Sequence, residues 1–295
     1  MPKESFEQFV KRQKEKLEKA EKMVEGVKEE WKEKIEEFEM VEKSVRELKN
    51  LWEENEKKLD TKNRYEAFSF FSSLPLPEVS SSLLERISNK FLKELKGFGR
   101  IEYLEYGLGL FLSAFLKKNI ESYISSQKEK GIKEEKIKPI EVHLNVKEAP
   151  IILINSLGYR NPKKLHLIIE RDCGYSTGNE MQGGKIIVEG SCELFTGDRM
   201  QGGEIIVKRN CGDCTGERVQ GGRIIIEGNC GKGTGFQMKG GELNIKGEVK
   251  SFAKSAFSPN NKGTIIWKGI KIWENGNWTK EGKEMWERGE VPIIK

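Results

Sequence analysis

Residues 173–191 read CGYSTGNEMQGGKIIVEGS, and three further copies of this 19-residue unit follow without a gap. The copies read CELFTGDRMQGGEIIVKRN, CGDCTGERVQGGRIIIEGN and CGKGTGFQMKGGELNIKGE, and the last ends at Glu248. A fixed period of this length is typical of repeat proteins, in which each unit buries its apolar side against its neighbours. Each copy holds one short β-branched run bounded by glycine, which predicts one strand per unit. The sequence therefore predicts a right-handed parallel β-helix whose strands stack roughly 4.8 Å apart.

Residues 19 apart lie side by side in such a stack, so equivalent positions must be compatible with one another. Three columns are apolar and are predicted to point inward: Ile186, Ile205, Ile224 and Leu243; Val188, Val207, Ile226 and Ile245; Met181, Met200, Val219 and Met238. Two columns are charged and alternate in sign in opposite phase: Lys185, Glu204, Arg223 and Glu242 before the strands, and Glu189, Lys208, Glu227 and Lys246 after them. Alternation avoids the repulsion of like charges on neighbouring strands, although each exposed pair contributes only about 0–1 kcal/mol.

Twelve glycines recur at fixed places in the repeat. They are Gly183, Gly184, Gly202, Gly203, Gly221, Gly222, Gly240 and Gly241 at the entry to each strand, and Gly178, Gly197, Gly216 and Gly235 at another corner. A bend with positive φ, or a close approach of two coils, requires glycine. The alternative is a phosphate-binding loop, which needs a helix directly after the glycines. Because no helix is predicted there, we interpret these glycines as structural.

The tandem pattern G–x–x–MxGGxIxVxGN resembles the GXGXG β-helix domain over about residues 151–270, most closely at Cys173–Gly247. That domain forms the C-terminus of the glutamate synthase large subunit and also occurs in one of the subunits of formylmethanofuran dehydrogenase. The resemblance implies a structural and docking module whose catalytic residues lie on other domains or subunits, so none maps onto this chain. Nothing in the sequence resembles an amidotransferase, a flavin-binding barrel or an iron–sulfur motif.

Four of the five cysteines recur at the repeat period and form a column: Cys173, Cys192, Cys211 and Cys230. The related domains place a small residue in this column, so the resemblance implies an inward position. We favour a buried thiol ladder, because free cysteine behaves as a small hydrophobe. Cys211 and Cys214 form a C-x-x-C pair, which leaves open a redox pair or half of a metal site. A linear column does not match the tetrahedral ligand set of zinc, and we expect no bound cofactor.

Composition limits the classes of function. Hydrophobic residues make up 36% of the chain and charged residues 34%, with Lys and Glu dominant, as in thermophilic proteins. The net charge is +5, and no basic arm is interleaved with aromatic residues, so we expect no nucleic-acid partner. The N-terminus is polar, and the longest apolar patch, Gly107–Phe115, is far shorter than the roughly 20 residues of a membrane span. We expect a soluble, cytoplasmic protein with no membrane partner.

Residues 4–59 carry apolar side chains whose spacing alternates between four and three. They are Phe6, Val10, Leu17, Ala20, Val24, Val27, Trp31, Phe38, Val41, Val45, Leu48, Trp52 and Leu59, with Gln13, Lys34 and Asn55 as polar members of the same stripe. One interpretation is a charged helix that lies against its own domain. A stripe of two positions in seven is narrow for a globular face, which favours a coiled coil over residues 1–60. Its partner is another copy of this chain or a different protein.

Residues 61–137 are predicted to form a small helical domain. Ser82 and Glu85 match a capping box that opens a helix to about residue 96, and a second helix is predicted over about residues 101–130. The aromatic stretch Phe68–Phe71 is assigned to the core, with a partner surface as the alternative.

The two ends of the β-helix are predicted to be capped, because an open end exposes unpaired backbone groups. Residues 138–172 contain two predicted strands, Ile140–Asn145 and Ile151–Asn155, as the N-terminal cap and first coil. Residues 173–248 form the four-repeat core. Residues 249–295 supply a strand at Gly263–Trp267 and a hairpin that turns at Asn275-Gly276.

Four isoleucines stand between the two inward columns of the strands: Ile168, Ile187, Ile206 and Ile225. Alternation places them on the outer face. A stripe of exposed isoleucines predicts an interface, covered by a helix of residues 60–130, by the C-terminal tail or by a separate protein.

The sequence contains no catalytic constellation. The leading hypothesis is therefore a non-catalytic scaffold that oligomerises or docks through the coiled coil and presents the β-helix to a partner. The alternative implied by the resemblance is an accessory subunit of an oxidoreductase complex, bound to its catalytic subunit. Two further hypotheses are redox or metal chemistry at Cys211 and Cys214, and a polysaccharide-cleaving enzyme. The latter needs clustered carboxylates, whereas acidic residues alternate with basic ones in the charged columns.

Overall fold

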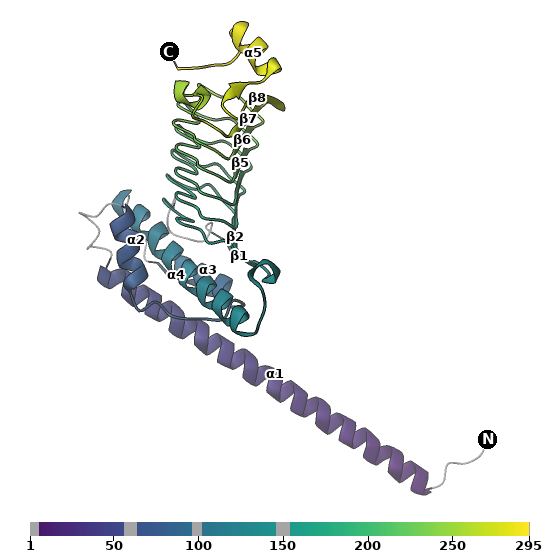
Figure 1. The fold of residues 1–295 in the computed structure, drawn as a ribbon. Coiled ribbons are helices and arrows are strands. Elements are labelled where there is room, and N and C mark those ends of the chain that lie inside the picture. Colours follow the sequence, from purple (N-terminus) through teal and green to yellow (C-terminus); the bar gives the residue numbers. More distant parts are fainter. Residues whose placement is uncertain (1–5, 56–63, 96–101, 146–153, 295) are drawn as a thin grey trace, which may run out of the picture. The chain divides into compact units, whose positions relative to one another are not determined.

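The strands of the C-terminal half stack in chain order and form one sheet in the computed structural model (Figure 1). The structure describes residues 6–55, 64–95, 102–145 and 154–294. Within these residues the sheet has nine strands: β1 (Ile140–Leu144), β2 (Leu165–Ile169), β3 (Lys185–Val188), β4 (Glu204–Val207), β5 (Arg223–Ile226), β6 (Glu242–Ile245), β7 (Thr264–Trp267), β8 (Ile270–Glu274) and β9 (Asn277–Trp278). Strands β1 to β7 are parallel. The predicted parallel β-solenoid with coils of about 19 residues is thus confirmed, with about five turns.

The core of the solenoid is filled by the apolar columns of the repeat. Ile205 pairs with Ile186 on one side and with Ile224 on the other, and all three side chains are fully buried. The remaining inward positions are buried as well: Leu243; Val188, Val207, Ile226 and Ile245; Met181, Met200, Val219 and Met238. Burial of one such side chain stabilises the fold by about 1.5–3 kcal/mol, so the repeated columns are the main source of solenoid stability.

The paired glycines serve the entry to each strand in two ways. Gly203 has a φ of +87°, and a Cβ on it would lie 2.6 Å from the carbonyl carbon of Gly183 on the preceding coil. The first glycine of a pair has no positive φ but lies against backbone. A Cβ on Gly221 would lie 2.6 Å from the carbonyl oxygen of Gln201. The second glycine of each pair is required for its backbone conformation. The first is required for close packing of the coils at Gly183, Gly221 and Gly240, whereas Gly202 has more room, with the nearest atom 3.1 Å from an added Cβ.

A second corner of each coil combines left-handed backbone with a buried threonine. The residue before the threonine has a positive φ in the first three repeats, at Ser176 (61°), Phe195 (63°) and Cys214 (56°). The threonine hydroxyls donate to the carbonyl oxygen three residues earlier, with O···O distances of 2.9–3.2 Å, at Thr177, Thr196, Thr215 and Thr234. Each hydroxyl therefore has a partner although the side chain is fully buried.

The chain before the solenoid is helical. Its helices are α1 (Phe6–Asn55), α2 (Arg64–Ser73), α3 (Leu84–Glu94) and α4 (Glu102–Glu129), followed by the short 3-10 helix η2 (Glu134–Lys136). The chain divides into two units, Met1–Ser44 and Val45–Lys295. The long N-terminal helix and the helix near residues 101–130 match the predictions. The sequence did not predict α2 as a separate helix, although Ala67, Phe68 and Phe71 are buried at helical spacing.

Aromatic side chains from three helices form the core of the helical part of the second unit. The ring of Trp52 on α1 lies 6.1 Å from that of Phe71 on α2 and 5.5 Å from that of Phe111 on α4, measured between centroids. All three side chains are fully buried. Phe68 is also buried, so the aromatic stretch of α2 belongs to the core. For the last turns of α1, packing against its own domain is thus the correct interpretation.

The predicted capping box at the start of α3 is wrong. No side chain caps the first turn of this helix, and the Ser82 hydroxyl lies 2.9 Å from that of Ser80. The Glu85 carboxylate instead accepts a hydrogen bond of 2.9 Å from the backbone N–H of His143 in β1. A partner 58 residues away has replaced the local one.

Side chains of α3 cap the free edge of β1. Besides the Glu85 contact, the Asn89 amide donates to the carbonyl of His143 at 2.8 Å and accepts from the N–H of Asn145 at 2.8 Å. The first edge of the stack thus has hydrogen-bond partners, as a capped β-solenoid requires. Most of the second strand predicted here, residues 151–153, lies outside the described residues.

The other end of the stack closes with antiparallel strands. Strand β8 pairs with β7 and β9, and the hairpin turns at Asn275 and Gly276, whose φ angles are 49° and 85°. The sequence predicted this turn. Helix α5 (Lys280–Glu287), which it did not predict, begins after Thr279, and the Thr279 hydroxyl accepts a hydrogen bond of 3.0 Å from the N–H of Gly282.

The C-terminal tail adds a further parallel contact at this end. The N–H of Phe252 donates to the carbonyl of Pro292 at 2.6 Å, and the N–H of Ile294 donates to the carbonyl of Phe252 at 2.9 Å. The short 3-10 helix η4 (Lys254–Phe257) follows Phe252 directly. The ring of Phe257 stacks on Trp278 with 4.3 Å between centroids, which joins η4 to the hairpin.

Candidate functional site

The isoleucine column lies on the outer face of the parallel sheet. Ile187 pairs with Ile168 and with Ile206, and Ile206 pairs with Ile225. All four side chains are half-buried, and each stands between two buried neighbours on its own strand. Asn244 continues the column on β6. The structure therefore holds the predicted interface residues together in one apolar stripe, while their role as an interface remains a prediction.

Charged columns border the isoleucine stripe on both sides. On one side Lys185 contacts Glu204 at 2.9 Å, and on the other side Lys208 contacts Glu227 at 3.2 Å. Further contacts join Arg223 to Glu242 at 2.7 Å and Lys246 to Glu227 at 3.4 Å. The hydrogen bond from Lys208 lowers the pKa of Glu227, so this side chain stays ionised. The sheet thus presents an apolar stripe between two columns of paired, opposite charges.

Cysteines of the repeat face the interior. Cys173, Cys192, Cys211 and Cys230 are buried, and backbone bridges join each to the next. All five cysteines are free thiols. The hydrogen bond with Cys192 and burial raise the pKa of Cys173, and burial raises the pKa of Cys192 and of Cys230. Thiolate is the reactive form of cysteine, so burial and the raised pKa suit Cys173, Cys192 and Cys230 to packing.

The C-x-x-C pair separates into two environments. Cys211 belongs to the buried column, whereas Cys214 is partly exposed at the left-handed corner. Burial and the neighbouring charge of Glu217 raise the pKa of Cys214. A reactive cysteine needs the opposite shift, so the raised pKa of Cys214 does not favour a redox pair, which stays an untested prediction. Within the described residues there is no group of three or more His, Cys, Asp or Glu side chains that could hold a metal ion.

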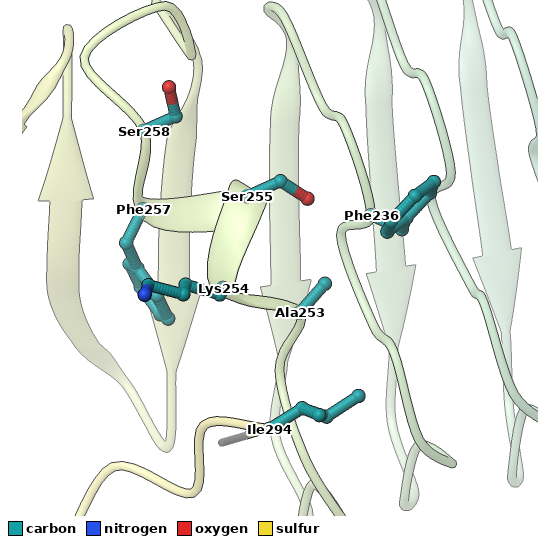
Figure 2. Close-up of a pocket in the computed structure, with 7 residues that line it drawn as sticks. All are labelled: Phe236, Ala253, Lys254, Ser255, Phe257, Ser258 and Ile294. Carbon is teal, nitrogen blue, oxygen red and sulfur yellow. The ribbon is translucent and has the colours of Figure 1, made fainter.

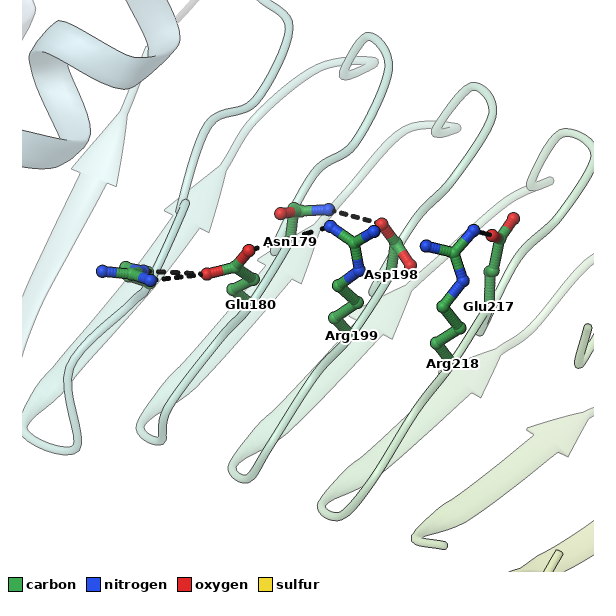
Figure 3. A network of polar contacts seen from close by, with 7 residues as sticks. Asn179, Glu180, Asp198, Arg199, Glu217 and Arg218 are labelled. Atoms are coloured by element: carbon green, nitrogen blue, oxygen red, sulfur yellow. Dashed lines mark hydrogen bonds and ion pairs between the residues drawn. The ribbon is translucent and has the colours of Figure 1, made fainter. Parts of the chain in front are cut away.

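A row of buried polar side chains lies beside the threonine corner, and it was not among the predicted site residues. Asn179, Asp198 and Glu217 occupy the same place on successive coils (Figure 3). They are 1%, 6% and 5% exposed. The Asn179 amide donates to Asp198 Oδ2 at 2.9 Å, and Glu217 accepts from Arg218.

The position after this row is charged on successive coils, as Arg160, Glu180, Arg199 and Arg218. Arg199 lies 3.9 Å from Glu180, and a second guanidinium, that of Arg160, lies 2.8 Å from the same carboxylate. Burial raises the pKa of Asp198, Arg199 opposes this shift, and Glu217 adds to it. In the described structure Asp198 Oδ1 is buried without a hydrogen-bond partner. The signal for this row was a polar residue directly after the first three Thr-Gly pairs of the repeat, whereas Phe236 follows the fourth.

A shallow pocket of about 650 Å³ lies near the C-terminal end of the solenoid (Figure 2). Its lining includes the rings of Phe236 and Phe257, the side chain of Ile294, and the polar groups of Lys254 and Ser255. The Ser255 hydroxyl accepts a hydrogen bond of 2.8 Å from the N–H of Gln237. The seven lining residues include no acid, histidine or cysteine, so the pocket offers apolar contact and one cation but no acid–base pair.

In the first unit, α1 exposes apolar side chains at the predicted heptad positions. Val27 is 51% exposed and Phe38 is 57% exposed. Met23 and Ile35, which flank the same stripe, are 74% and 53% exposed. Farther along the helix the same pattern continues through Val45, Leu48 and Trp52, which are buried in the second unit. The heptad pattern therefore serves two different environments along one helix.

Comparisons with known proteins add no identity. No protein-family model matches the chain, and no curated protein or solved structure matches it either. None of the helices in the described residues combines the length and apolar character that a bilayer span requires. The β-solenoid is established by the structure, while the resemblance to the GXGXG domain rests on the repeat residues alone.

Proposed function

We propose that this chain is a non-catalytic assembly protein, in which α1 pairs with the α1 helix of a second copy and the solenoid is offered to a partner. One observation carries the proposal: apolar side chains at heptad spacing are exposed in the first unit. Val27 and Phe38 are each more than half exposed, although both occupy core positions of the heptad pattern. Core positions of a coiled coil become buried only when a second helix is present.

The stripe is wide enough to bury a substantial area. Met23 precedes a core position of the heptad by one residue and Ile35 follows one, and both are exposed apolar side chains. Burial of each large apolar side chain contributes about 1.5–3 kcal/mol. A second copy carries the same stripe with the same spacing, so a symmetric pair matches apolar positions along the whole exposed segment.

The exposed stripe ends after Phe38, because Val41 at the next core position is buried, and the second unit begins at Val45. Val45, Leu48 and Trp52 are buried in that unit, so they are not available to a second helix. The proposed coiled coil therefore lies within residues 6–40, and the last turns of α1 join it to the helical core. In this arrangement the N-terminal half of the heptad pattern contacts a second copy, and the C-terminal half packs into the helical core of the same chain.

Sedimentation velocity of the full chain over a dilution series tests this proposal. The double variant V27E/F38E places charge in the stripe, and we expect its dissociation constant to rise by on the order of a hundredfold or more. M40E is the matched control, because Met40 is an exposed apolar residue of the same helix (47%) outside the heptad core positions. An unchanged constant for V27E/F38E, or a wild-type chain that sediments at 33.8 kDa up to about 100 µM, would refute self-pairing.

The repeat supports a second candidate, an accessory subunit that docks onto an oxidoreductase. Its support is the 19-residue coil with glycine at both corners, which the GXGXG domains of glutamate synthase and formylmethanofuran dehydrogenase share by resemblance. Gentle purification of the tagged full chain from its native cells, read by mass spectrometry, tests it. Recovery of a cofactor-bearing catalytic subunit in near-equal amount supports this candidate, and recovery of the chain alone counts against it.

A further inference from the structure

The outer face of the sheet carries charge in a checkerboard. On each coil of the repeat, the residue two positions before the centre of the strand and the residue two positions after it are opposite in sign. The four rows are Lys185 and Glu189 around β3, Glu204 and Lys208 around β4, Arg223 and Glu227 around β5, and Glu242 and Lys246 around β6. Neighbouring rows are also opposite in sign, since Lys185 pairs with Glu204, Glu204 with Arg223 and Arg223 with Glu242.

Stacking within one chain explains only part of this pattern. Contacts such as Lys185–Glu204 and Lys208–Glu227 require that the sign alternates down each column. They do not require the two columns to be in opposite phase. The columns are four residues apart along each strand, or roughly 13 Å, which exceeds the Debye length of about 8 Å at physiological salt. Contacts within the chain therefore leave the relative phase of the two columns free to serve another contact.

A second copy of the same face accounts for it. Consider two such sheets face to face, related by a two-fold axis parallel to the direction in which the strands stack. Each row then faces itself with its ends exchanged, so Glu204 faces Lys208 of the other copy and Lys208 faces its Glu204. Every row of the checkerboard becomes complementary in this way, and the isoleucine stripe faces itself. Packed sheets lie roughly 10 Å apart, a distance that apolar side chains from both faces fill.

The apolar stripe selects this axis over the other possible one. A two-fold axis parallel to the strands, midway between β4 and β5, also pairs opposite charges. It places Ile187 against Asn244 of the other copy, which sets an apolar side chain against an amide. The axis along the stack instead places Ile187 against Ile187 and Asn244 against Asn244, where two amides can donate to and accept from each other.

We propose that the outer face of strands β2 to β6 is a self-association surface that binds the same face of a second copy of this chain. The half-buried isoleucines form its centre, and the exposed Glu189, Lys208 and Lys246 belong to its rim. This surface is separate from the stripe on α1, so it does not depend on the proposed coiled coil. Charge at the rim fixes the register of the two copies, while the isoleucines supply the apolar burial.

The test uses the full chain with the α1 stripe already disrupted by V27E/F38E. In this background the proposal predicts a remaining dimer of about twice 33.8 kDa by sedimentation velocity. Adding I206R should raise the dissociation constant by on the order of a hundredfold. R288E/E290R exchanges an exposed ion pair of 2.6 Å outside this face and should leave the constant unchanged.

Charge exchange within one row separates cross-copy contact from stacking within the chain. The single variants E204K and K208E should each weaken the dimer, and the double variant E204K/K208E should restore it, because each new lysine again faces a glutamate of the other copy. If these residues served only the columns of their own chain, the double variant would be at least as impaired as either single one. That result, or a monomeric V27E/F38E chain beside an associating wild type, would overturn this inference and leave the α1 proposal intact. A monomeric wild type would refute both.

Discussion

Replacing Gly203 with alanine should destabilise the solenoid, whereas the same change at the adjacent Gly202 should not. The two glycines lie in the same turn, both are half-buried, and each substitution adds only a methyl group. They differ in backbone conformation, because Gly203 has a φ of +87° and Gly202 has no positive φ. The difference in stability between the two alanine variants therefore measures the cost of the left-handed conformation and of the close approach at Gly203.

Three terms determine the expected size of the effect. A left-handed conformation costs an alanine about 1–2 kcal/mol. The added Cβ of Gly203→Ala would lie 2.6 Å from the carbonyl carbon of Gly183, and relieving such a contact in close-packed backbone costs about 1–3 kcal/mol. The lower entropy of the unfolded alanine variant offsets about 0.4–1 kcal/mol. The free energy of unfolding should thus fall by about 2–4 kcal/mol.

For Gly202→Ala the nearest atom to the new Cβ is the carbonyl oxygen of Gln182, at 3.1 Å. A shift of a few tenths of an ångström relieves this contact, so the free energy of unfolding should change by no more than about 0.5 kcal/mol. Urea titration followed by circular dichroism measures both variants, and a loss of about 2–4 kcal/mol should shift the midpoint by about 1 M or more. Equal losses in the two variants, or a larger loss at Gly202, would refute the assigned role of the positive φ.

The remaining predictions concern the helical core and the buried polar row. Trp52→Ala removes a fully buried ring that contacts Phe71 and Phe111. The free energy of unfolding, measured in urea, should fall by about 3–5 kcal/mol. A fall of less than about 1 kcal/mol would contradict the packing described. Burial raises the pKa of Asp198, so the folded state binds the proton of this carboxyl more tightly than the unfolded state does. Stability should therefore fall as the pH rises from the usual aspartate pKa of 3.8 through the higher pKa of the folded state. Asp198→Asn should remove this dependence and melt at a higher temperature than the wild type at pH 7; a melting temperature lowered at pH 7 would show that the ionised carboxylate is favourable there.

The repeat made most of the solenoid predictable, because its physical constraints are periodic. A column such as Ile186, Ile205 and Ile224 must be apolar at every copy if it faces the interior, and the 19-residue register then follows. The hairpin at Asn275-Gly276 was predictable for a local reason, since both residues tolerate positive φ. Periodic and local constraints are both visible in a single sequence.

Contacts between distant segments were not predictable in the same way. Glu85 matches a capping residue by its spacing from Ser82, yet it accepts a hydrogen bond from His143, which lies 58 residues away. The row of Asn179, Asp198 and Glu217 did leave a periodic signal. A polar residue at a bend is normally solvated, however, and only the coil geometry shows that these three are buried.

The heptad pattern of α1 illustrates why periodicity identifies a buried face but not what covers it. From Val45 onward the stripe packs into its own unit, and Asn55, a polar member of the stripe, donates a hydrogen bond of 2.7 Å to the carbonyl of Leu51. At Val27 and Phe38 the same spacing leaves apolar side chains exposed. Spacing is identical in both halves because any helix that buries one narrow face obeys the same 3.5-residue repeat. Exposure in the folded chain is therefore the property that separates the two halves, and it directs the search for a second helix to residues 6–40.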